Sequence, residues 1–493
     1  MLQPDFTFQP KTSWLTFCLS LFVALLVGQL GVQPSKAGGN VWTVCQSAPP
    51  DDCDFDDINT AVNNASVMDG DILTFPVNRE TYAPININNK EITLQGNNTE
   101  IDAADAGTAV TITNGSKTAT FNDFTIQNGN SSNGAGILLN SGNLTLTDVS
   151  FNGNDATNDG GALYVSSSGS SVNLTDVTMQ TNTAVASGGA IYNNGTLTAD
   201  NLSLTDNEAV EGGGIYNNGT VMLNNQTAVQ RNMVTQSGGG IYNDSGGDVT
   251  ITDSDVSSNE AVNGAAVYNE GTLQVTNSNL GSSNIAMQAG GGLFNSGQAT
   301  LLNSAVVQND GATGAGIYNE GTLTATNSTF SRNEGANGAG LYNQSDTATL
   351  NNVTIHLTIG TSIFANGGTV NVGNTIISSV SGNAACGGSG NFNSNGYNLA
   401  NDQSCTFLTA TGDLQGLDPD LNGINSPADS AAYHAPKLTS PVIDAGNPAA
   451  PGSNSTACLA TDQRGLERPQ STRCDIGAVE IEIFRLYVPA VLK

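Results

Sequence analysis

The chain has 493 residues, of which only 11% are charged and 58 are glycine, and its formal net charge is −30. So large an excess of acid repels nucleic acid and anionic membranes, and we expect neither as a partner. Aliphatic residues still recur at regular intervals among Gly, Asn, Ser and Thr, which excludes a disordered chain and favours a fold rich in turns.

Residues 1–37 have the pattern of a secretory signal peptide. Lys11 precedes an apolar run at 15–32, and Ser35 and Ala37 place small residues at the −3 and −1 positions of a cleavage site. An uncleaved anchor helix is the alternative for the same run. After cleavage we expect no membrane span, and a location outside the cell or on its surface.

Residues 38–76 are expected to form an N-terminal cap. The stretch DFDDINTAVNNAS predicts a short helix, because Ile58, Ala61 and Val62 share one apolar face. GDILTFP at 70–76 predicts the strand that follows. A helix here would cover the open end of the first repeat, where an uncovered β-edge invites aggregation.

Residues 77–380 repeat one pattern every 24 to 28 residues. GGGIYN occurs at 212–217 and again at 238–243, and near-copies flank both. An aromatic or leucine position, always preceded by an aliphatic residue, marks the repeats at Leu138, Tyr164, Tyr192, Tyr216, Tyr242, Tyr268, Phe294, Tyr318 and Tyr342. Two asparagine columns share the period: Asn154, Asn182, Asn207, Asn232, Asn259, Asn284, Asn309 and Asn333, and Asn193, Asn217, Asn243, Asn269, Asn295, Asn319 and Asn343. Three columns with one period predict one structural unit per repeat.

Each repeat reads as two or three short strands joined by tight turns. GTLTATNSTFSRN at 321–333 alternates apolar with polar residues, which is the period of a strand. One repeat has too few apolar residues to bury a core alone, so copies must stack. We predict an all-β fold, a right-handed parallel β-helix of about a dozen coils with aliphatic residues inside and asparagine ladders at the corners. The pattern matches neither leucine-rich repeats nor the longer blades of a propeller.

Residues 381–480 differ in texture and are expected to form a C-terminal cap module, followed by an apolar tail at 481–493. Six cysteines remain after signal removal, and all lie outside the repeats. Proximity in sequence suggests three structural disulfides, Cys45–Cys53, Cys386–Cys405 and Cys458–Cys474, although 15 pairings are formally open. Disulfides agree with an exported protein.

Several segments resemble known families. GGAI at 188–191, with FNGN at 151–154 and FSRN at 330–333, resembles the GGAI and FxxN repeats of polymorphic outer-membrane proteins. Residues 42–76 resemble the N-terminal segment of pectin-lyase-like β-helices. The TDQRG and CDIGA motifs within 441–480 resemble the C-terminal segment of choice-of-anchor Q surface proteins, and LYVPAVLK resembles the endings of some of them. The resemblance implies an exported surface β-helix and implies no chemistry.

Catalysis of the pectin-lyase type requires a base beside carboxylates or calcium, and the sequence offers few bases. Between residues 101 and 400 they are Lys117, Arg231 and Arg332. The two arginines hold matching corner positions four coils apart, roughly 19 Å at the spacing of stacked strands. We therefore expect them to be turn residues that face solvent.

Hydrolysis would need two carboxylates at a defined separation. Candidate members are Asp206 with Glu208, Asp253 with Asp255, and Asp159, but so many acids make such pairs common. His356 and His434 lie in no motif, and we expect both to be structural. We assign no catalytic residue. We also assign no cofactor or metal site, although an acidic rod could bind Ca²⁺ diffusely.

Two groups of residues carry the binding hypotheses. Tyr192, Tyr216, Tyr242 and Tyr268 each follow an inward aliphatic residue, so they point outward. They either form a stripe on which sugars stack or pack on one another over a coil face. The charges of the C-terminal block, at Asp462, Arg464, Arg468, Asp475 and Glu480, either dock a ligand or form internal salt bridges.

From these observations we expect a non-catalytic, structural and adhesive protein. Its partners would be an extracellular polysaccharide or the cell envelope, with the four tyrosines as the candidate glycan-binding residues. The alternative is a polysaccharide lyase or glycoside hydrolase with the same fold.

Overall fold

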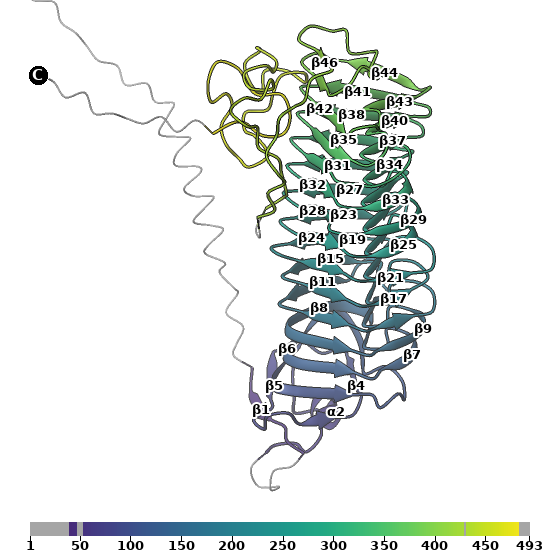
Figure 1. Cartoon of the computed structure of the whole chain (residues 1–493). Helices are drawn as coiled ribbons and strands as arrows, with labels where there is room; N and C mark the ends of the chain where they lie inside the picture. Colours follow the sequence, from purple (N-terminus) through teal and green to yellow (C-terminus); the bar gives the residue numbers. More distant parts are fainter. Residues whose placement is uncertain (1–38, 47–52, 428–429, 483–493) are drawn as a thin grey trace, which may run out of the picture.

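The computed structural model describes residues 39–46, 53–427 and 430–482. Figure 1 shows a long rod of stacked β-strands whose N-terminal end lies at the bottom. The described residues after the last strand, 416–427 and 430–482, lie beside its upper half and are called the C-terminal segment. The predicted signal peptide and nearly all of the predicted tail lie outside the described residues. Within the described part, no helix is long and apolar enough to cross a membrane.

The N-terminal end closes the first coils with a helix, as predicted. Helix α2 (Ile58–Asn63) buries Ile58, Ala61 and Val62, and the Asp57 carboxylate caps it by accepting the Thr60 N–H at 2.7 Å. The strands of this end are β1 (Val41–Thr43), β2 (Asp71–Thr74), β3 (Thr81–Tyr82), β4 (Ile85–Asn88), β5 (Ile92–Asp102), β6 (Val110–Gln127) and β8 (Ile137–Asn152). The last two strands run through more than one side of a coil, because their partners lie in several stacks.

Four stacks of parallel strands make the walls of the rod. The first stack continues from β8 through β10 (Leu163–Val165), β14 (Ile191–Asn193), β18 (Ile215–Asn217), β22 (Ile241–Asn243), β26 (Val267–Asn269), β30 (Leu293–Asn295), β34 (Ile317–Asn319), β37 (Leu341–Asn343), β40 (Ile363–Ala365) and β43 (Cys386–Gly388). The second contains β11 (Ser171–Thr175), β15 (Thr196–Asp200), β19 (Thr220–Asn224), β23 (Asp248–Thr252), β27 (Thr272–Thr276), β31 (Gln298–Leu302), β35 (Thr322–Thr326), β38 (Thr347–Asn351), β41 (Thr369–Gly373) and β44 (Asn391–Ser394).

The third and fourth stacks complete each coil. The third contains β12 (Thr178–Gln180), β16 (Ser203–Thr205), β20 (Ala228–Gln230), β24 (Asp255–Ser257), β28 (Asn279–Gly281), β32 (Ala305–Val307), β36 (Thr329–Ser331), β39 (Thr354–Thr358), β42 (Ile376–Ser379), β45 (Leu399–Ala400) and β46 (Leu414–Gln415). The fourth, a separate sheet, contains β7 (Asn130–Asn133), β9 (Asp155–Asp159), β13 (Thr183–Ala184), β17 (Glu208–Ala209), β21 (Met233–Val234), β25 (Glu260–Asn263), β29 (Ile285–Ala289) and β33 (Asp310–Thr313).

The repeat sets the register between coils. Ile215 pairs with Ile241 and Tyr216 with Tyr242 in adjacent parallel strands, and both isoleucines are fully buried. Because side chains alternate across a strand, each aliphatic residue before the aromatic position enters the core. The predicted parallel β-solenoid is confirmed, with about 13 turns.

The glycines of each GGG run are needed for two different reasons. Gly238 has a φ of +71°, which L-amino acids with a side chain rarely adopt. Two residues later, a Cβ on Gly240 would lie 2.6 Å from the Ala266 carbonyl oxygen of the next coil. The recurring motif therefore combines a left-handed turn with a close approach of neighbouring coils.

The rod extends further than the predicted boundary at 380. Cys386 pairs in parallel with Ile363, Leu399 with Ile376, and Leu414 with Leu399, so coils continue beyond that point. The period shortens and the GGxIYN motif is lost there, so the sequence pattern does not indicate these coils. The Cys386–Cys405 disulfide consequently belongs to the last coils of the rod.

The C-terminal segment lies along the side of the rod and does not sit on its end (Figure 1). Asn327 donates from Nδ2 to the Thr461 carbonyl at 2.7 Å, and Asn374 donates to the Thr456 carbonyl at 2.9 Å. The Ala478 N–H donates to Thr354 Oγ1 at 2.9 Å. Turn and strand residues of the upper coils thus satisfy polar groups of a segment that has no described strand beyond Gln415.

Candidate functional site

The first recurring feature is a buried asparagine ladder at one corner, the corner ladder (Asn154 to Asn333). Asn232 donates from both its backbone N and Nδ2 to Oδ1 of Asn259, each at 3.0 Å, and Asn259 donates from Nδ2 to the Val229 carbonyl at 2.9 Å. Every member is almost fully buried. Since each amide satisfies backbone and side-chain groups of its neighbours, the corner ladder is used for stability and leaves no donor free for a ligand.

A second ladder, the turn ladder (Asn193 to Asn343), lies just after the aromatic position. Asn217 donates from Nδ2 to Asn243 Oδ1 at 2.9 Å and to the Gly219 carbonyl at 3.0 Å, while its Oδ1 accepts the Gly219 N–H at 3.1 Å. Its amides close the tight turn that leads to the second stack. Both ladders confirm the predicted asparagine columns.

The aromatic side chains form a continuous column on the outer side of the first stack. Neighbouring rings from Tyr164 to Phe364 have centroids 4.7–5.3 Å apart and lie within 21° of parallel. Each interior ring is therefore covered on both faces by its neighbours. Stacking of a sugar on Tyr192, Tyr216, Tyr242 or Tyr268 needs a free face, so that mode of glycan binding is not offered by this geometry. The column presents ring edges and hydroxyl groups.

Carboxylates flank these hydroxyls. Tyr216 donates its hydroxyl to Asp244 at 3.0 Å and Tyr318 donates to Glu320 at 3.4 Å. Burial, and after it the hydrogen bond to Asp244, raises the pKa of Tyr216. Burial also raises the pKa of Glu211, with smaller contributions from Glu270 and Asp244. The outer side of the column is therefore an acidic, hydroxyl-lined strip.

The bases of the rod do not combine into a site. Arg231 forms an exposed ion pair with Asp206 at 2.9 Å, and Lys117 pairs with Asp69 at 2.7 Å. Arg332 is exposed and has a positive φ, as Arg231 does in the matching corner position. Among the described residues, no group of three or more His, Cys, Asp or Glu side chains is arranged to hold a metal ion.

The structure brings the two histidines together. The His356 and His434 rings meet edge to face, with centroids 4.8 Å apart. His434 Nδ1 lies 2.8 Å from the Asn422 carbonyl, which can only accept, so Nε2 accepts from the Ser331 hydroxyl at 2.8 Å. Burial lowers the pKa of both rings, that of His356 to about 3. This pair joins the rod to the C-terminal segment, and no sequence motif predicts it.

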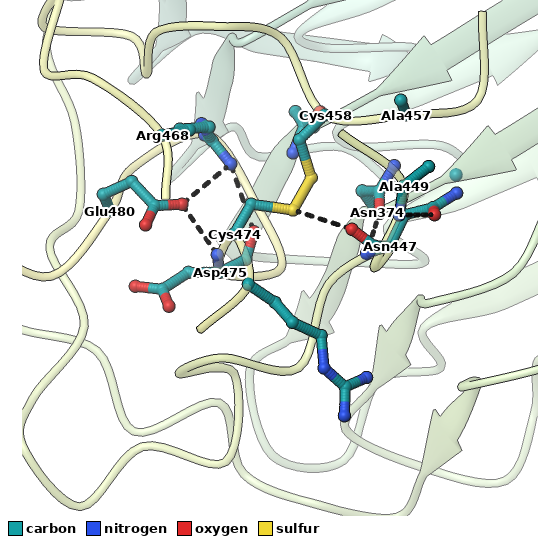
Figure 2. The surroundings of a disulfide bond; sticks show 12 residues. Asn374, Asn447, Ala449, Ala457, Cys458, Arg468, Cys474, Asp475 and Glu480 are labelled. Carbon is teal, nitrogen blue, oxygen red and sulfur yellow. Dashed lines mark hydrogen bonds and ion pairs between the residues drawn. A yellow bond between two sulfur atoms is a disulfide. The ribbon is translucent and has the colours of Figure 1, made fainter. Parts of the chain in front are cut away.

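The charges of the C-terminal segment form a buried internal network. Figure 2 shows Arg468 reaching Glu480, with an N–O distance of 3.3 Å, beside the Cys458–Cys474 disulfide. Arg464 pairs with the fully buried Asp462 at 2.7 Å. Burial raises the pKa of Glu480. Of the two expectations for this block, internal salt bridges are confirmed, because these groups are used within the fold.

All three disulfides join cysteines that are close in sequence: Cys45–Cys53, Cys386–Cys405 and Cys458–Cys474. They hold the two ends of the rod and the C-terminal segment, where ladders give the chain little support. They are consistent with an oxidising, extracellular environment.

Two hollows lie near the upper end of the fourth stack. One, of about 530 Å³, is bordered by His356, Ser379, Asn383, Asp402 and Asp418. The other, of about 510 Å³, is bordered by Asp310, Glu334, Ala336, Ile359 and again Asn383. None of the acidic residues expected as hydrolase candidates lines either of these two hollows. Asp253 and Asp255 border a separate hollow of about 340 Å³, whose lining includes Asn279 and Ser430 and no base.

Comparison with known proteins gives little more. No family model and no curated protein matches the chain. Among solved structures, pectate lyase Pel9A is similar at 13% sequence identity, with a TM-score of 0.34, over 91% of this chain and 98% of that one. A likeness this distant does not place the chain in the family of that enzyme.

Proposed function

We propose that this protein is an exported, non-catalytic β-helix that serves as a structural and adhesive rod at the cell surface. The main support for this proposal is that the recurring side chains contact one another. The asparagines of two ladders hydrogen-bond along the axis, and the aromatic rings stack on their copies in neighbouring coils. Such contacts between neighbouring coils stabilise a long, narrow rod.

The surface chemistry supports adhesion through polar contacts. The acidic strip beside the aromatic column, with Tyr216 and Asp244 as one bonded pair, offers acceptors and hydroxyl groups in a periodic row. Polysaccharides also repeat at short intervals and present donors. An anionic polymer would meet repulsion from this strip.

A glycan array combined with an assay for release of reducing ends tests the proposal. We expect retention of one or more glycans with no release of reducing sugar and no unsaturated uronide. Release of either product would replace the adhesive function with an enzymatic one.

An enzyme of the same fold is the second candidate, and one observation favours it. Asp310 and Glu334 are partners on adjacent turns and border the same hollow. Paired carboxylates are what glycoside hydrolysis requires. If products do appear, Glu334→Gln separates this pair from a contaminant, because it would abolish their release.

A further inference from the structure

The two hollows open where the corner ladder ends. Asn333 is its last member, and the next coil places the buried Thr358 there, which bonds Ser362 Oγ at 2.8 Å and not a ladder amide. The pairing between β39 and β42 shifts register at this point. Because Asn383 borders both hollows, they adjoin at this residue, and we call the two together the groove.

The floor of the groove holds an unsatisfied polar group. His356 is only 9% exposed and its Nδ1 has no hydrogen-bond partner. A buried ring nitrogen without a partner is rare in folded proteins and asks for an explanation. Neighbouring groups are occupied: Ser379 donates its hydroxyl to the Asn383 carbonyl at 2.6 Å, and Asp402 accepts the Ala385 N–H at 3.0 Å.

The walls combine carboxylates with apolar surface. Asp310 and Glu334 project from adjacent turns on the same face, and Ile359, the partner of Glu334 on the next turn, is 46% exposed. Asp418 is exposed at the other end of the groove. Among the described side chains that line the two hollows, none is lysine or arginine.

We propose that this groove binds a sugar unit that is uncharged or carries an amine. A pyranose ring has an apolar face that fits Ala336 and Ile359, and it has hydroxyl donors for the carboxylates of Asp310 and Glu334. Four carboxylates without a lining base would repel a uronic acid. The inference deepens the proposed adhesive function and rests on it, because it names a site and a ligand class.

Nuclear magnetic resonance of the disulfide-bonded chain tests this directly. The chain has two histidines, so its ¹H–¹⁵N imidazole spectrum contains two ring systems. The probes are cellohexaose, glucosamine hexamer and hexagalacturonate. We expect one or both of the first two to shift the His356 ring signals, which separates a neutral from an amino sugar. A shift with hexagalacturonate alone, or with none of the three, would overturn the proposal.

A pair of tryptophan variants locates the site. Ala336→Trp fills the groove from an exposed position, whereas Thr235→Trp places the same ring at the matching exposed position four coils lower, away from both hollows. We expect at least a tenfold weaker affinity in the first and an unchanged affinity in the second. Equal binding by both variants would refute this site. Retention of Ala336→Trp on a glycan array would refute it too, but would leave the adhesive function standing.

Discussion

The outer face of the third stack differs between the lower and the upper half of the rod. In β12, β16 and β20 the outward residues are exposed or half-buried, and we call this the bare face. In β32, β36 and β42 every residue is buried, and with β39 these strands make the covered face. The C-terminal segment lies mainly against the covered face, for example where Ala432 accepts the Gln463 side chain beside Thr329. It also reaches β28, where the Ala432 N–H donates to Asn279 Oδ1 at 2.9 Å.

One backbone geometry therefore serves two environments, which differ in their outward residues. Thr205 and Ser331 hold the same position in their coils, as the register through β20, β24, β28 and β32 shows. Thr205 is half-buried, whereas Ser331 is fully buried and bonds His434. The rod supplies the shape, and small or apolar outward side chains decide where another segment can dock.

Arg468→Ala should have the largest effect and should separate the two faces. Removal of the guanidinium leaves Glu480 and its neighbours buried without a counter-charge, which costs about 3–5 kcal/mol. We expect the C-terminal segment to lose protection in hydrogen exchange while the coils of the bare face keep theirs. Loss of protection throughout the rod would show that the two regions unfold as one unit.

Asn207→Ala and Asn309→Ala test whether the lower and upper halves of the rod differ only at the surface and share an equivalent interior. Each amide donates to a carbonyl of the preceding coil and to the ladder asparagine of the next coil, Asn207 at 3.0 Å to both and Asn309 at 2.9 and 3.1 Å. Each variant leaves buried partners unsatisfied, for a loss of about 3 kcal/mol in local free energy of unfolding. Because the ladder is internal in both halves, we expect equal losses by native-state hydrogen exchange. A clearly smaller loss at either position would contradict an equivalent ladder.

Acid should weaken the covered face through His356. Its folded pKa of about 3 lies below the ordinary 6.5, so below pH 6.5 the unfolded state takes up a proton that the folded state does not. The stability contributed by the neutral ring is lost as pH falls, at about 1.4 kcal/mol per pH unit, or roughly 2 kcal/mol between pH 6.5 and 5.

The buried carboxyls act in the opposite direction. Burial raises the pKa of Glu480 and Asp475, so the folded state binds their protons more readily and gains stability as pH falls. The measurement is therefore the difference between the natural chain and His356→Leu in hydrogen exchange at several pH values. Identical slopes in the two proteins would rule out the histidine as the cause.

Ser331→Ala compared with Thr205→Ala isolates one contact. The first removes the donor to His434 Nε2 and leaves a buried nitrogen unpaired, for about 1–2 kcal/mol. The second changes a residue on the bare face and should cost less than about 1 kcal/mol. Differential scanning calorimetry combined with hydrogen exchange measures the loss of stability in each variant. A larger loss for Thr205→Ala would invert the comparison.

Arg231→Ala should have the smallest effect. Its ion pair with Asp206 is exposed on both sides, and such pairs contribute about 0–1 kcal/mol. We expect unchanged protection in the corner ladder next to it. A loss of protection comparable to that in Arg468→Ala would mean that this exposed ion pair contributes substantially to stability.

The sequence predicted the parts of the fold that repeat. The alternation around Ile215 and Ile241 predicted their pairing, and the spacing of Ile58, Ala61 and Val62 predicted the buried face of α2. Local patterns suffice in these cases, because strand and helix periods decide which side of the backbone a residue occupies.

The candidate site was predicted less well. Alternation gave the outward direction of Tyr216 but not that its ring lies about parallel to those of Tyr192 and Tyr242, which covers both faces. The hollow beside His356 depends on a register shift and on Asn383, in coils where the repeat motif has already faded.

The stacking of coils along the axis follows from the repeat in the chain: one period, two ladders, one column and an interior of aliphatic side chains. The position of the C-terminal segment is visible in the three-dimensional fold and not in any sequence pattern, because its contacts, such as that of His434 with Ser331, join residues 103 positions apart. Stacking depends on a local repeat, whereas docking depends on the complementarity of two surfaces that share no pattern.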